Sequence, residues 1–118
     1  MALHSQLPIY RVAYDLLGLA TDVTRSMPRD FRTSIGAQLR AECVDLVVLI
    51  FRANVARNKV THLETLLERL QVAELLFRLS RDKRLISTGQ YAQAIRLTDS
   101  VGKQANGWRR NAAAAPVA

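Results

Sequence analysis

Apolar residues recur with helical spacing in four long segments of this chain, and three short breaks separate the segments. The spacing predicts helices over residues 8–25, 31–57, 61–83 and 88–110, and no segment alternates as a strand does. Short connections make successive helices antiparallel neighbours. The sequence therefore predicts an all-α fold, an antiparallel up-down-up-down four-helix bundle formed by a single domain, residues 1–110. Residues 111–118, "NAAAAPVA", have nothing to pack against and are expected to be a disordered tail.

Short patterns also predict where individual helices begin. Pro8 suits the first turn of a helix. The stretch "THLE", Thr61–Glu64, matches a capping box, in which the first side chain accepts from a free amide and the fourth reaches back. The stretch "STGQ", Ser87–Gln90, is a weaker version of the same pattern. These patterns place the starts of the first, third and fourth helices.

The two middle helices carry a second apolar stripe opposite the stripe expected to face the core. Its larger residues are Val44, Val48, Phe51, Val55, Val72, Leu75 and Leu79. A small monomeric bundle needs one apolar face per helix, because the other face meets water. The second stripe therefore predicts a homo-oligomer, in which these residues form the interface. The alternative is an apolar surface without a partner.

Positive charge is concentrated in the last third of the chain. The net charge is +7, and residues 76–118 hold eight basic and two acidic residues, whereas residues 1–75 hold nine and eight. Cations near the end of one helix can offset its macrodipole, but this effect covers only the last turn. A basic third of a chain instead indicates a polyanionic partner, with RNA or DNA the leading candidate.

The candidate phosphate contacts lie in two groups. One group lies at the end of the third helix, in "FRLSRDKRLIS", and consists of Arg78, Arg81, Lys83 and Arg84. The other group lies along the fourth helix and consists of Arg96, Lys103, Arg109 and Arg110. Spacings of seven residues keep three members of the second group on one helix face. Arg81 could instead pair with Glu74 inside the bundle end.

Base recognition has less support than phosphate binding. Tyr91 and Trp108 could stack on bases, but both fit the apolar side of their helix. Contacts to phosphate give affinity without reading sequence. The sequence therefore favours a charge-driven nucleic-acid binder that tolerates different sequences.

Features of enzymes and metal proteins are missing from the sequence. His4, His62 and Cys43 are scattered, and neither histidine follows a glutamate by three positions, as in di-metal bundles. No phosphate-binding loop or nucleophile elbow is present, and Cys43 fits a core position. We expect no catalytic residue, no metal and no cofactor, although a metal- or cofactor-binding bundle is a third hypothesis. One cysteine, no signal peptide and no membrane span favour the cytoplasm.

Several stretches resemble one known family. These are "LPIYRVAYDLLGLA", "MPRDFRTSIGAQLRAECVDLVVLIFRAN", "LLFRLSRDKRLISTGQYAQAI" and "VGKQANGWRR". Their order is similar to that in Avd-like accessory proteins of diversity-generating retroelements. The "MPRDFRTSIGAQLR" stretch also resembles the related bundle proteins encoded by intervening sequences in bacterial 23S rRNA genes.

The resemblance implies a basic four-helix bundle that assembles as a pentameric ring. It implies two further partners, the element's reverse transcriptase and nucleic acid. Such proteins support copying of a template-repeat RNA and mutagenic transfer into a target gene, while the polymerase supplies the chemistry. The alternative is a bundle of the rRNA intervening-sequence type that self-assembles and has no polymerase partner.

Overall fold

The computed structural model describes residues 3–115, which form helices and no strand. A short 3-10 helix, η1 (His4–Gln6), precedes five α-helices. They are α1 (Pro8–Arg25), α2 (Arg29–Arg32), α3 (Ile35–Val55), α4 (Val60–Asp82) and α5 (Thr88–Ala114). The all-helical prediction is confirmed. No helix in this part of the chain has the length and apolarity needed to cross a lipid bilayer.

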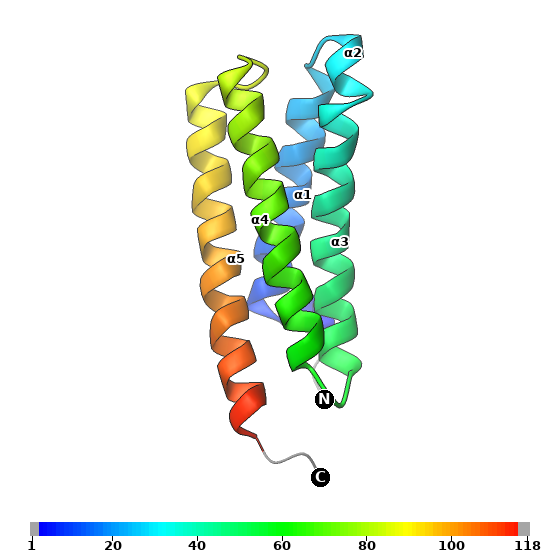
Figure 1. The fold of residues 1–118 in the computed structure, drawn as a ribbon, viewed down its shortest axis with the longest axis vertical. Helices are drawn as coiled ribbons and strands as arrows, with labels where there is room; N and C mark the ends of the chain where they lie inside the picture. Colours follow the sequence, from blue (N-terminus) through cyan, green and yellow to red (C-terminus); the bar gives the residue numbers. More distant parts are fainter. Residues whose placement is uncertain (1–2, 116–118) are drawn as a thin grey trace.

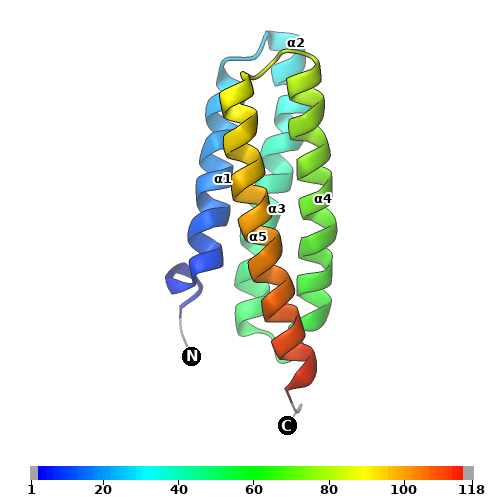
Figure 2. The ribbon, with the colours of Figure 1, turned by 90° about the vertical axis from the view of Figure 1, so that its left-hand side faces the viewer.

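The four long helices lie side by side in a rod of 51 × 21 × 20 Å (Figures 1 and 2). Contacts join α1 to α3, α3 to α4, α4 to α5, and α5 back to α1. Figure 1 shows the connection that contains α2 and the α4–α5 connection at one end of the rod, and the α3–α4 connection at the other. The first end is called the two-connection end below. Met27 and Ile86, one from each of its connections, are buried in the core.

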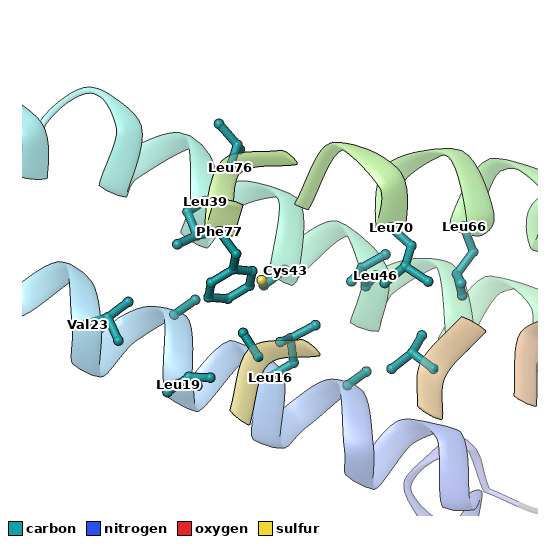
Figure 3. Close-up of a cluster of buried hydrophobic side chains, with 14 of the residues drawn as sticks. Leu16, Leu19, Val23, Leu39, Cys43, Leu46, Leu66, Leu70, Leu76 and Phe77 are labelled. Carbon is teal, nitrogen blue, oxygen red and sulfur yellow. The ribbon is translucent and has the colours of Figure 1, made fainter. Parts of the chain in front are cut away.

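Side chains from all four long helices form the core. Leu39, Cys43 and Leu46 of α3 are fully buried, and Phe77 of α4 directs its ring toward Cys43 (Figure 3). Leu16 completes this cluster from α1. Burial of such side chains contributes roughly 1.5–3 kcal/mol each, which stabilises helices that would be marginal alone.

The predicted helix over residues 31–57 is wrong at its start. The structure instead has the short α2, a break at Thr33 and Ser34, and then α3. Ser34 has non-helical backbone angles, φ −114° and ψ −91°. Its hydroxyl donates to the Asp30 carbonyl at 2.6 Å, and the Thr33 hydroxyl donates to the Arg29 carbonyl at 3.1 Å. Side chains that bond to the backbone in this way compete with helix continuation.

Of the two predicted capping boxes, one is wrong and one is confirmed. Thr61 lies inside α4, which starts at Val60 and has no side-chain cap. The Lys59 ammonium instead closes the α3–α4 connection, where it donates to three carbonyls of residues 53–56 at 2.9–3.0 Å. At α5, Ser87 Oγ accepts from the Gln90 amide at 3.0 Å, and Gln90 Oε1 accepts from the Ser87 amide at 2.8 Å.

The C-terminal tail also differs from the prediction. Residues 111–114 continue α5 to Ala114, because alanine has the highest helix propensity and needs no tertiary contact to extend a helix already formed. The expectation of disorder is wrong for these four residues. Residues 116–118 of the same predicted tail lie outside the described residues.

Candidate nucleic-acid interface and assembly surfaces

The end of α4 is built by a Schellman motif around Arg84. The Leu85 amide donates to the Ser80 carbonyl at 2.8 Å, and the Arg84 amide donates to the Arg81 carbonyl at 2.9 Å. This motif requires a residue with a left-handed backbone conformation just after the helix, and that residue is usually glycine. Here it is Arg84, with φ 59°, the one non-glycine residue of the described chain with a positive φ. The turn therefore presents a cation at the position where glycine is normally favoured.

The ion pair with Glu74, one of the two alternatives for Arg81, does not form; Arg81 pairs with Asp82 instead. Its guanidinium donates to Asp82 Oδ1 through Nη2 at 2.8 Å and through Nε at 3.1 Å. It also lies over the Tyr91 ring, 4.4 Å from the centroid. The hydrogen bond to Asp82 raises the pKa of the Arg81 guanidinium. Arg81 thus connects α4 to α5 through Tyr91, and Asp82 offsets part of its charge.

The predicted basic line on α5 is exposed, but one member is paired. Arg96, Lys103 and Arg110 all have exposed side chains. Lys103 Nζ lies 2.9 Å from Asp99 Oδ2, one turn earlier. This pair weakens the line at its centre.

Three other candidates on α5 are half-buried. Arg109 donates to Asn106 Oδ1 at 3.4 Å, and its buried Nε has no partner among the described residues. Tyr91 and Trp108 pack against the core cluster. These placements favour packing roles over contact with a nucleic acid.

The eight predicted phosphate contacts do not form one surface. Arg78, Arg81, Lys83 and Arg84 lie at or near the two-connection end, whereas Arg110 lies in the second-last turn of the 27-residue α5. At 1.5 Å per residue, Arg110 lies about 33 Å from the start of this helix, whereas Arg96 lies about 12 Å from it.

The sequence analysis missed three arginines at the two-connection end: Arg25, Arg29 and Arg32. They flank or belong to α2, and all three are exposed. They belong to residues 1–75, where basic and acidic residues nearly balance, so the charge count along the sequence did not select them. The missed signal was topological, because the first and third connections of a four-helix bundle meet at the same end.

The predicted interface residues lie on two different faces. On α3, Val44, Phe51 and Val55 are 44%, 46% and 55% exposed, and Val48 is half-buried. The ring of Phe51 packs edge-on against His4, whose ring contacts Tyr10. Val44, Phe51 and Val55 define the α1–α3 apolar surface, whereas Val48 lines a groove with Thr65 and Arg69 of α4.

The second face lies on α4 and α5. Leu75 is 63% exposed and lines a groove with Ile95, which the sequence analysis did not select and which is 39% exposed. Val72 and Leu79 are half-buried. Leu75 and Ile95 define the α4–α5 apolar surface. Because α1–α3 and α4–α5 are opposite sides of the ring of helix contacts, the two surfaces face away from each other.

Cys43, the single cysteine of the sequence, is buried in the core. Burial, followed by the charge of Glu42, raises the pKa of the Cys43 thiol to about 12, so the thiol stays protonated at neutral pH. Within residues 3–115, no three His, Cys, Asp or Glu side chains gather closely enough to hold a metal ion. His62 lies in the first turn of α4.

The fold and these surfaces define a basic helical bundle protein with exposed apolar residues on two faces. Residues 7–112 match the model of the bAvd-like family, so the chain belongs to this family. No curated protein matches the chain.

Proposed function

We propose that this protein is a non-catalytic accessory protein of a diversity-generating retroelement, located in the cytoplasm. It binds nucleic acid and the element's reverse transcriptase, and so supports template-repeat RNA copying and mutagenic retrohoming. The observation that carries the proposal is membership of the bAvd-like family over residues 7–112. The net charge of +7 supports an affinity for RNA or DNA.

The proposal includes assembly of the antiparallel bundle into a closed ring. A two-fold dimer would pair one apolar surface with its own copy and leave the other exposed. Head-to-tail pairing of the α1–α3 apolar surface with the α4–α5 apolar surface of the next subunit covers both. Repetition of such a contact closes a ring when the rotation permits, and a pentamer is the expected size.

Mixing two variants tests the head-to-tail contact. Phe51→Glu blocks the α1–α3 apolar surface, and Leu75→Glu blocks the α4–α5 apolar surface. Each variant alone should be monomeric by light scattering, because every contact needs both surfaces. An equal mixture should form dimers, because each pair retains one intact contact. Monomers in the mixture, or wild-type mass in either variant, would contradict this assembly.

Two measurements test the partners. Affinity for a labelled RNA should fall steeply as salt rises, whereas a flat response would contradict phosphate binding. The reverse transcriptase encoded beside this gene should co-purify with the protein. A gene located inside an rRNA gene, with no neighbouring polymerase, would instead support the intervening-sequence alternative.

A further inference from the structure

We propose that the phosphodiester backbone of the bound nucleic acid contacts the two-connection end of the bundle, rather than the exposed line along α5. The contact residues are Arg29, Arg32, Arg78, Lys83 and Arg84, which we call the basic end surface. The inference rests on the proposed nucleic-acid binding and assigns that binding to a place on the molecule.

Positive charge gathers at this end because two stretches that are distant in the sequence meet there. Residues 25–32 and 78–84 together contain seven basic and two acidic residues. The two stretches are distant in sequence, but both connections lie at the same end of the rod (Figures 1 and 2). Arg25 is left out of the basic end surface because it pairs with Asp22 at 3.6 Å. Positive potential that adds over a small area attracts a polyanion more strongly than the same charges spread along a helix.

The acidic residues of these two stretches do not pair with the basic end surface. Asp82 is bound by Arg81, and Asp30 makes no ion pair with any described residue. The five residues of the basic end surface have exposed side chains and likewise no ion pair within residues 3–115. On α5, by contrast, the central cation Lys103 is paired with Asp99.

The backbone at Arg84 is a second, independent observation. A left-handed conformation is unfavourable for a residue with a Cβ, and glycine would remove this cost. Arginine at φ 59° therefore costs stability at a turn that needs no side chain for packing, because Arg84 is exposed. Strained backbone of this kind is concentrated at functional sites.

The size of the end suits a short stretch of nucleic acid. The rod is 20–21 Å across. One strand of a duplex advances about 3.4 Å per phosphate, so about six phosphates span this width. The end is therefore wide enough to contact several successive phosphates.

The test compares three double variants of the full-length protein, each of which removes two exposed arginines without an ion pair. Arg29→Gln with Arg32→Gln alters the basic end surface, and Arg96→Gln with Arg110→Gln alters the α5 line. Arg11→Gln with Arg57→Gln is the matched control, because both residues belong to segments at the opposite end. Circular dichroism and light scattering should show the same helicity and mass for all three. The probe is a labelled single-stranded RNA, titrated at several NaCl concentrations.

The slope of log affinity against log salt separates the outcomes. With a single-stranded probe, removal of each cation that meets a phosphate should reduce the magnitude of this slope by about 0.7. The Arg29/Arg32 variant should therefore show a slope smaller by about 1.4, and the other two variants should keep the wild-type slope. A reduced slope for the α5 variant, with an unchanged slope for the Arg29/Arg32 variant, would overturn this inference and leave the proposed function intact. Absence of wild-type binding at low salt would overturn the proposed function itself.

Discussion

Thr24 and Gly36 join α1 to α3 at the two-connection end. The Thr24 hydroxyl donates to the Gly36 carbonyl at 3.4 Å, and both residues are buried. A Cβ added to Gly36 would lie 2.6 Å from Thr24 Cγ2 and 3.3 Å from the Phe31 carbonyl oxygen. The absence of a side chain at position 36 therefore allows α3 to start directly against α1 and α2.

Gly36→Ala should destabilise the protein by about 1–3 kcal/mol, because the new methyl group overpacks this contact. Urea unfolding at one fixed protein concentration measures the effect. Gly18→Ala is the matched control. Position 18 lies in the interior of α1 with open space around it, so alanine should stabilise the protein by up to about 1 kcal/mol. Equal effects of the two substitutions would show that Gly36 is not needed for packing.

Ser87→Ala should cost about 1 kcal/mol, because it removes one half of the capping box of α5. Thr61→Ala in the other predicted capping box should change stability by less than about 0.5 kcal/mol, because Thr61 caps nothing in the structure. Thermal unfolding of both variants checks the contrast. A larger loss for Thr61→Ala than for Ser87→Ala would contradict the observed start of α4.

Arg84→Gly should stabilise the protein by about 1 kcal/mol, because glycine adopts φ 59° without the cost of a Cβ. The same substitution should weaken RNA binding if Arg84 belongs to the basic end surface. Lys83→Gly removes the same charge one residue earlier, where φ is −84°. It should therefore lower stability by about 0.5–1 kcal/mol. Chemical unfolding and RNA titration of the two variants separate the backbone effect from the charge effect.

Glu74 should make stability depend on pH. Burial, followed by the negative charge of Asp99, raises the pKa of the Glu74 carboxyl above its ordinary value of 4.5. The ionised form is therefore disfavoured in the folded protein. Its unfavourable contribution is absent below pH 4.5 and complete above the raised folded pKa.

Glu74→Gln should consequently be more stable than the wild type near neutral pH. The gain should be at most about 1 kcal/mol, because solvent screens this partly exposed carboxyl. The difference should shrink as pH falls toward 4.5, which unfolding curves at several pH values would show. A gain that is independent of pH would mean that packing, rather than charge, causes it.

The features that the sequence predicted correctly depend on residues that are close together along the chain. Apolar spacing predicted the four long helices and the core position of Cys43, because a periodicity of 3.6 residues places Cys43 and Leu46 on one face wherever the helix lies. The Ser87 capping box was predictable for the same reason, since its partners are three residues apart. The all-helical fold and the net charge were likewise contained in the sequence.

Only the tertiary structure decided which distant side chains share a surface. Arg81 had two possible partners in the sequence, and the position of α5 placed Tyr91 beneath it. Arg29 and Arg32 were not predicted as phosphate contacts, because their part of the sequence has a low net charge. In the structure their connection lies at the same end of the bundle as Lys83. Charges interact through space, so their contribution depends on how helices are arranged, whereas helix formation depends mainly on neighbours along the chain.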